Sequence, residues 1–346
     1  PRRGVREALS GKSRERGSAG RKEKREGMAA STLTQADVAD LETKLNTHPE
    51  DNSIQRKLLA CLRALKSRRP DLVVRAGLPL LAGGGRGLGK SEVWDVREQV
   101  YLACLELHMW DHAEGQLDAM RKKFPKSTRV KGLGGMMCEA RGGASDTSKE
   151  DATRFYEAAI GVYKSITEED PANAFALKRK VCCMRGLGSP EALTTAVGYL
   201  NEYLELFPTD VESWRELSEM YLEQGHVEAA KFALEECLML SPVNYVNHTM
   251  LADTLYTLGD HGTARKYYAQ SLELNNGPTN ARAALGMVLC TTAISGKRGA
   301  TQEEKANNTP LFEVGKAALL ESYSHLPDKN PGKEVSKLAK RWLKVT

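Results

Sequence analysis

The sequence predicts an all-α protein, a right-handed α-solenoid of stacked helix-turn-helix repeats. One observation behind this prediction is a pattern of apolar and small residues that recurs 34 residues further along the chain. The residues that stand one period apart are Leu217 and Leu251, Gly225 and Gly259, and Ala230 and Ala264. A second observation is that apolar residues within a unit recur every three or four positions, which places them on one face of a helix. Fixed periods of this length are typical of arrays in which each repeat packs on its neighbours.

The unit that starts near Trp214 shows how the two helices of a repeat are encoded. Its first helix has an apolar face formed by Trp214, Leu217 and Tyr221. Gly225 then breaks the helix, because glycine readily takes the left-handed conformation that ends helices. Small Ala230 lets a second helix approach the first closely, and Pro242 ends that helix because proline lacks an amide hydrogen. The order and the 34-residue length match the tetratricopeptide repeat (TPR).

The same phase extends to both sides of this unit and predicts about six repeats. Further units run over 94–127, 128–171 and 173–208, another repeats the pattern one period on with Leu251, Gly259 and Ala264, and a last one begins near Asn280. The glycine- and serine-rich residues 141–148 interrupt the second unit as an inserted loop, and a short insertion is expected around 186–190.

The flanks of the repeats complete the expected domain organisation. We expect a disordered basic leader at 1–30, N-terminal helices and a glycine-rich loop at 31–92, the TPR solenoid at 93–295, and a C-terminal loop with capping helices at 296–346. The helices are predicted at 34–46, 53–66 and 71–82 before the repeats and, after a polar loop at 296–310, at 311–325 and 332–345. No apolar run reaches the about 18 to 20 residues that cross a bilayer.

The positive net charge is concentrated in the leader. Residues 1–27 hold ten Lys or Arg and four Glu, which is +6, so the rest of the chain carries −1 of the total of +5. A near-neutral solenoid is unlike a phosphate-binding surface, which argues against nucleic acid as a partner. Met28 is followed by Ala-Ala-Ser, which favours a start there and a non-native leader; a native disordered arm and a targeting segment are the alternatives.

No metal site, cofactor or catalytic group is predicted from the cysteines and histidines. The seven cysteines include no C-x-x-C pair, and Cys104 and Cys237 occupy helix positions where a small apolar residue packs. His108 and His112 lack the flanking pattern of a zinc helix, and we interpret them as loop and turn residues. These observations favour a protein that is not an enzyme.

The sequence contains one match to the pattern of a nucleotide-binding motif. Gly84, Gly89, Lys90 and Ser91 satisfy G-x-x-x-x-G-K-[ST], the loop whose backbone amides and lysine hold phosphates. That loop must follow a buried strand, whereas the preceding residues predict a helix. The alternative is a glycine-rich linker between two helices, with Ser91 near the start of the second helix and able to cap it.

A second functional hypothesis is a co-chaperone repeat that grips a C-terminal carboxylate. That site needs basic and Asn side chains one turn apart on successive first helices. Arg215 is followed by Glu219, and the next repeat offers Val246 and Met250 where polar residues are required. No carboxylate clamp assembles from these positions.

Residues between the repeat positions resemble a particular family. The stretches that carry the resemblance include FPKSTRVKGL at 124–133, LNEYLE at 200–205, ESWRELSEMY at 212–221 and AQSLELNN at 269–276. They look like the TPR subunit of the ER membrane protein complex, subunit 2, over 92–289 and most strongly over 155–275. The loop at 83–89, the insertion at 141–148 and the basic leader depart from that pattern.

The resemblance implies a non-catalytic, peripheral subunit on the cytoplasmic face of the ER membrane. Such a subunit would support the insertion of tail-anchored and multi-pass membrane proteins, and its partners would be the other cytosolic and membrane-embedded subunits. The candidate contact residues are polar, outward positions of first helices, namely Lys131, Lys178, Arg215 and Glu219. The alternative is a generic TPR adaptor or co-chaperone that binds a cytosolic protein.

Overall fold

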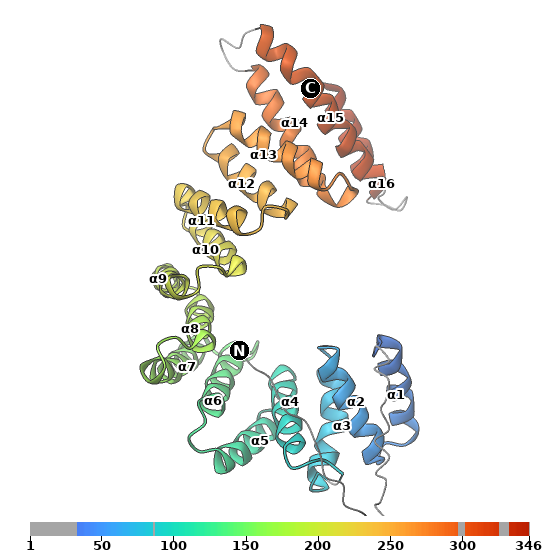
Figure 1. Cartoon of the computed structure of the whole chain (residues 1–346), viewed down its shortest axis with the longest axis vertical. Coiled ribbons are helices and arrows are strands. Elements are labelled where there is room, and N and C mark those ends of the chain that lie inside the picture. The colour runs from blue at the N-terminus through green and yellow to red at the C-terminus, as the bar shows by residue number, and fades with distance from the viewer. Residues whose placement is uncertain (1–32, 86, 297–301, 325–331, 346) are drawn as a thin grey trace, which may run out of the picture. The chain divides into compact units, whose positions relative to one another are not determined.

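The structure, a computed structural model, describes residues 33–85, 87–296, 302–324 and 332–345. Sixteen α-helices and one 3-10 turn make up all the regular structure of these residues (Figure 1), as the all-α prediction requires. No helix within these four ranges is long and apolar enough to cross a membrane. The expected leader at 1–30 lies outside the described residues.

The chain divides into two compact units, one up to Val96 and one from Arg97. The first unit contains α1 (Gln35–Thr47), α2 (Asn52–Ala64), α3 (Pro70–Ala82) and the start of α4 (Glu92–Glu106). Asp51 begins α2 by accepting a hydrogen bond from the Ser53 amide at 2.7 Å, and caps of this kind are set by local sequence. The three helices predicted before the repeats are therefore confirmed.

The second unit continues α4 and adds helix pairs joined by short turns. Its further helices are α5 (Trp110–Lys123), α6 (Thr128–Gly142), α7 (Lys149–Glu169), α8 (Ala174–Leu187), α9 (Pro190–Leu206), α10 (Val211–Glu223), α11 (Val227–Leu240), α12 (Tyr245–Thr257), α13 (His261–Leu274), α14 (Ala281–Gly296), α15 (Gln302–Ser324) and α16 (Gly332–Val345), with the 3-10 turn η1 (Pro278–Asn280) before α14. Many of these helices pack on their neighbours in sequence, as in α6 with α7, α10 with α11 and α12 with α13.

Helix starts and turns repeat the same devices along this unit. The side chains that cap successive first helices by accepting a backbone amide hydrogen bond are Ser127, Asn173, Asp210 and Asn244. Gly225 and Gly259 close the turns within two repeats with φ of 75° and 83°, where a side chain would be strained. The helix breaks predicted at these two glycines are confirmed.

The residues that set the repeat phase lie in the core between helices. Leu217, Ala230, Leu251 and Ala264 are each at most 1% exposed. Trp214 and Tyr221 are half-buried and pack against the cluster that contains Leu217. The second helix of this unit, α11, ends at Leu240, two residues before Pro242.

A close helix approach depends on the absence of a side chain at Gly135. A Cβ atom built there would lie 2.6 Å from Cζ of Tyr163, a fully buried residue of α7. The Tyr163 ring therefore fills the space in which a larger residue on α6 would stand. Gly286 of α14 plays the same part for Tyr268 of α13.

The polar loop expected at 296–310 is partly wrong, because α15 already begins at Gln302 and includes Pro310. Tertiary contacts explain why proline does not end this helix. Arg265 of α13 donates a hydrogen bond to Oδ1 of Asn308, and Asn308 is 1% exposed. Anchoring at this buried amide outweighs the one backbone hydrogen bond that proline removes.

Two local expectations also need correction. His112 lies within α5 rather than in a loop, whereas His108 takes φ of 56° in the preceding turn and stacks on Trp110. Around 186–190 the turn consists of Gly188 and Ser189 alone, and the extra length lies in α9, which has 17 residues against 14 in α11. The inserted loop of the second repeat is present between α6 and α7.

Candidate partner-binding surface

The residues of the nucleotide-binding motif form a linker between α3 and α4. Arg56 of α2 donates hydrogen bonds to the Gly87 carbonyl at 2.7 Å and to Glu92 Oε1 at 3.1 Å. Glu92 Oε2 in turn accepts from the Gly89 amide at 3.3 Å. The loop thus closes on α2 and on the first residue of α4, and the element before it is a helix, so the strand that a phosphate-binding loop requires does not precede it.

The two cysteines singled out by the repeat phase are packing residues. Cys104 and Cys237 are fully buried, and burial raises the pKa of each thiol to about 11. Thiols of this kind are poor nucleophiles near neutral pH. Across the described part of the chain, no group of three or more His, Cys, Asp or Glu side chains could hold a metal ion.

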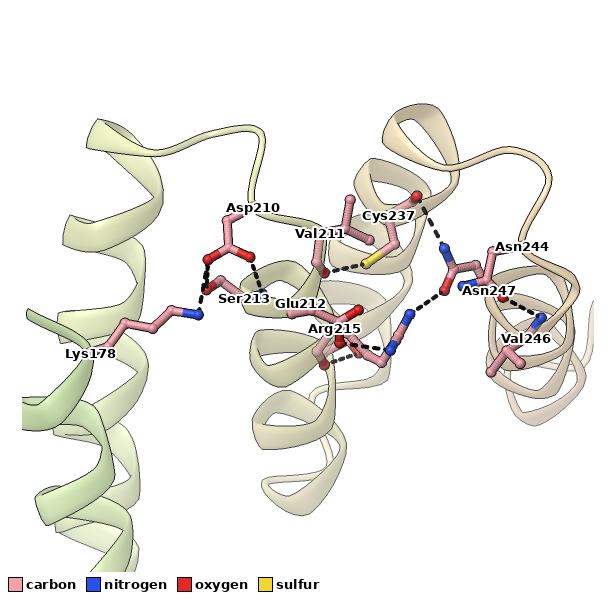
Figure 2. A network of polar contacts seen from close by, with 11 residues as sticks. Lys178, Asp210, Val211, Glu212, Ser213, Arg215, Cys237, Asn244, Val246 and Asn247 are labelled. Atoms are coloured by element: carbon pink, nitrogen blue, oxygen red, sulfur yellow. Dashed lines mark hydrogen bonds and ion pairs between the residues drawn. The ribbon is translucent and has the colours of Figure 1, made fainter. Parts of the chain in front are cut away.

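Lys178, one of the predicted contact residues, joins two successive repeats. Its Nζ on α8 lies 2.9 Å from Oδ2 of Asp210, the residue that caps α10, as Figure 2 shows. The same carboxylate oxygen accepts hydrogen bonds from the Ser213 hydroxyl at 2.8 Å and the Tyr203 hydroxyl at 2.9 Å. Lys178 also lies over the Tyr203 ring, 5.0 Å from its centroid.

This arrangement favours the ionised form of Asp210. Burial raises the pKa of the carboxyl group, but the hydrogen bonds from Lys178, Ser213 and Tyr203 outweigh it and lower the pKa to about 2. For the neighbouring phenol, burial and the Asp210 charge raise the pKa of Tyr203 to about 12. Near neutral pH Lys178 is thus paired with a negative charge within the chain.

Arg215 makes the next inter-repeat contact, from α10 to α12. Its Nη2 donates to Oδ1 of Asn247 at 3.1 Å, and its Nη1 to Glu212 at 2.8 Å. Asn247 is completely buried and donates its own amide to the Cys237 carbonyl of α11 at 3.3 Å. Figure 2 shows this contact and the Lys178–Asp210 pair as two groups of polar contacts, one between α8 and α10 and one that joins α10, α11 and α12.

The Arg215 contact is one of a series that links neighbouring first helices, which are α4, α6, α8, α10, α12 and α14. Each of the five junctions between them contains an arginine that bonds to an acidic or amide side chain. These arginine bridges are Arg129 to Glu98 (2.7 Å), Arg179 to Glu139 (2.5 Å), Arg185 to Glu216 (3.0 Å), Arg215 to Asn247 (3.1 Å) and Arg282 to Asp253 (2.5 Å). Their regular occurrence indicates that they help to fix how each repeat sits on the next.

The four predicted contact residues do not form one cluster. Lys131 of α6 pairs with Glu169 at the end of α7, 2.7 Å away, while Lys178 and Arg215 face the inter-repeat partners described above. Glu219 is exposed on α10. Sequence reasoning missed Asp210 and Asn247, although a helix-capping Asp and a polar residue in the buried phase of a repeat are both recognisable signals.

An apolar groove lies over three first helices near these contacts. It has a volume of about 440 Å³, and its lining residues are Glu98, Leu102, Thr128, Arg129, Leu133, Met136, Ile166, Asn173 and Phe175. Phe175 is 46% exposed, and its ring lies against α6 where a Cβ at Gly132 would come within 2.9 Å. The bridge between Arg129 and Glu98 forms part of the groove wall. An apolar floor with a charged edge can accept an apolar segment of a protein partner.

The helix pairs and their turns define the class of protein as an α-solenoid of TPR repeats. A sequence model described as the EMC2 TPR-like repeat domain matches residues 138–273. ER membrane protein complex subunit 2-A of Xenopus laevis is 31% identical over 259 residues, 74% of this chain and 81% of that protein. Subunit 2-B of the same species is 31% identical over 82% of this chain and 86% of its own length. The subunit 2 of Dictyostelium discoideum is 31% identical over 64% of this chain and 65% of its own.

The chain therefore belongs to the ER membrane protein complex subunit 2 family. The family model and the region of strongest resemblance in the sequence overlap over most of the repeats. The inter-repeat network of Figure 2 lies inside the matched region.

Proposed function

We propose that this chain is a non-catalytic scaffold subunit of the ER membrane protein complex on the cytoplasmic side of the ER membrane. In this role it holds other cytosolic and membrane-embedded subunits together and so supports the insertion of tail-anchored and multi-pass proteins. The observation that carries the proposal is the match to subunit 2 proteins over 81% and 86% of their own lengths. A match of this extent covers the repeat array rather than a single repeat motif.

The charges of the repeats support a scaffold role. Lys178 and Arg215 each bond to a side chain of the neighbouring repeat, so their charges stabilise the array itself. TPR arrays present their binding surface as a whole, and the relation of one repeat to the next sets its geometry. A chain whose polar side chains bond between its own repeats is suited to hold partners in fixed relative positions.

The groove lined by α4, α6 and α8 is the proposed contact site for one partner subunit. Phe175 supplies exposed aromatic area at its edge, and aromatic residues are enriched among those that dominate binding energy. The Arg129 and Glu98 side chains lie beside it. A partner helix or extended segment with an apolar face would bury Phe175 and keep these charges at the rim.

Fractionation of cells that express the tagged chain tests the localisation. The chain should sediment with ER membranes and should be released by alkaline carbonate, as is expected of a peripheral subunit. Recovery in the cytosolic fraction, with heat-shock chaperones as the main bound proteins, would instead support the co-chaperone alternative and contradict the proposal.

A pair of exposed-residue variants tests the groove. Phe175→Glu should lower the recovery of other subunits after mild detergent by about tenfold or more, the loss typical of a binding hot spot. Met239→Glu is the matched control because Met239 is 74% exposed on α11, away from the groove residues. Thermal unfolding of both variants checks that they fold. Equal recovery with both would show that the groove is not the contact site.

A further inference from the structure

The helix α16 has two unlike faces. Val335, Leu338 and Trp342 follow one another at spacings of three and four residues, which puts them on one stripe of the helix. Their exposed fractions are 39%, 63% and 38%. Three large apolar side chains on one helix thus remain in contact with solvent.

The opposite side of α16 is basic. Lys337, Lys340 and Arg341 are all exposed and lie at the one-turn spacings that form a second stripe. Lys337 pairs with Glu334 of its own helix at 3.0 Å. The 14 residues of α16 contain five Lys or Arg and one Glu, a net charge of +4.

This charge contrasts with the rest of the repeat-containing chain. Residues 28–346 carry −1 in total, so these residues without α16 sum to −5. The positive charge outside the leader is therefore concentrated on the helix that also exposes an apolar stripe. A basic face joined to a Leu- and Trp-containing face is the pattern of helices that lie in the interface of an anionic membrane.

The attachment of α16 to the rest of the unit leaves the apolar stripe accessible. Leu343 is 2% exposed and belongs to the core cluster that also contains Leu319 of α15. Leu343 lies to one side of the stripe on the helical wheel, so α16 is anchored along one edge. Val335, Leu338 and Trp342 stay partly exposed beside this anchor.

We infer that α16 binds directly to the surface of an anionic lipid bilayer. Val335, Leu338 and Trp342 would enter the boundary between headgroups and acyl chains, while Lys337, Lys340 and Arg341 contact anionic headgroups. A helix of 14 residues is about 21 Å long, which suits a position in the plane of the interface and is shorter than the about 30 Å hydrocarbon core. The concentration of positive charge favours lipid headgroups over an apolar protein groove.

This inference goes beyond the proposed scaffold function, because it assigns the chain a lipid contact of its own. Vesicle flotation with the purified full-length chain tests it without any other subunit. The vesicles are phosphatidylcholine alone and phosphatidylcholine with phosphatidylserine. The chain should float with the anionic vesicles, and less should float when added salt shortens the Debye length from about 10 Å to about 3 Å.

Variants of α16 identify the helix as the origin of the binding. Leu338→Glu should reduce the partition coefficient at least about tenfold, because the leucine side chain then no longer enters the membrane. Removing Lys340 and Arg341 as Gln should reduce it about fivefold for each charge. Leu206→Glu is the control, since Leu206 is 51% exposed on α9. The basic leader is common to all variants, so differences between them report on α16.

The inference is overturned if the wild-type chain does not float with anionic vesicles at low salt. It is equally overturned if Leu338→Glu and the double Gln variant float as the wild type does. The same holds if Val335, Leu338 and Trp342 become buried only when a partner protein, and not lipid, is present. Circular dichroism confirms that each variant is folded. Loss of flotation together with unchanged recovery of other subunits would separate this inference from the scaffold proposal.

Discussion

Replacing Asn247 by alanine should loosen α10, α11 and α12 together and leave α1 to α3 unchanged. Asn247 is completely buried and bonds to Arg215 of α10 and to the Cys237 carbonyl of α11. A hydrogen bond to a charged group contributes about 1.5 to 3 kcal/mol and a neutral one about 0.5 to 1.5 kcal/mol. Arg215 keeps its contact with Glu212, and the Cys237 carbonyl keeps the Ser241 amide at 2.9 Å. We therefore expect a loss of about 2 to 3 kcal/mol, toward the lower part of the combined range.

Native-state hydrogen exchange read by mass spectrometry measures this loss locally, which suits a repeat array whose unfolding need not be two-state. Peptides from α10 to α12 should exchange roughly 30- to 150-fold faster in Asn247→Ala. Asn276→Ala, an exposed asparagine in the turn after α13, is the control and should change nothing. Unchanged exchange in Asn247→Ala, or an equal acceleration in α1 to α3, would refute the view that Asn247 couples neighbouring repeats.

Three further predictions follow from other sites. Gly135→Ala should destabilise the protein by about 1 to 3 kcal/mol in urea unfolding, because the added methyl group collides with Tyr163. The control Gly161→Ala, whose methyl group meets no neighbouring atom within 4 Å, should instead stabilise α7 by about 0.5 to 1 kcal/mol. Similar effects of the two substitutions would contradict the packing argument. The pKa of Asp210 is lowered from 3.8 to about 2, so its charge should contribute about 1 to 2 kcal/mol to the free energy of unfolding above pH 3.8, a contribution that is lost as the pH falls toward 2. The urea midpoint of Asp210→Asn should therefore fall less over that interval than the midpoint of the wild type. An identical fall in both proteins would count against the Lys178 pairing. Neither the wild type nor Lys90→Ala should show a magnesium-dependent thermal shift with ATP or GTP, and a shift confined to the wild type would restore the nucleotide-binding hypothesis.

The repeat frame could be predicted because it depends on local chemistry. The recurrence of Leu217 at Leu251 and of Gly225 at Gly259 encodes helix faces and turns that each form within one repeat. Burial of the leucines and left-handed φ at the glycines bear this out. Pro310 shows the limit of the same local rules, since a contact from α13 extends α15 through it.

The contacts between repeats were not predictable in the same way. Lys178 and Arg215 look outward on a helical wheel, but the neighbouring repeat brings Asp210 and Asn247 to them. The arginine bridges join residues about 29 to 40 positions apart, and their reach depends on how the helices cross rather than on either helix alone. A role of Lys131, Lys178, Arg215 and Glu219 in partner binding stays a prediction.

Affinity purification of the tagged full-length chain from ER membranes in mild detergent tests the central claim most directly. Quantitative mass spectrometry should recover a fixed set of single-pass and multi-pass ER membrane proteins in constant proportion to the chain. Recovery of the chain alone, or with cytosolic chaperones in place of that set, would contradict the account of this protein as a scaffold subunit of the ER membrane protein complex.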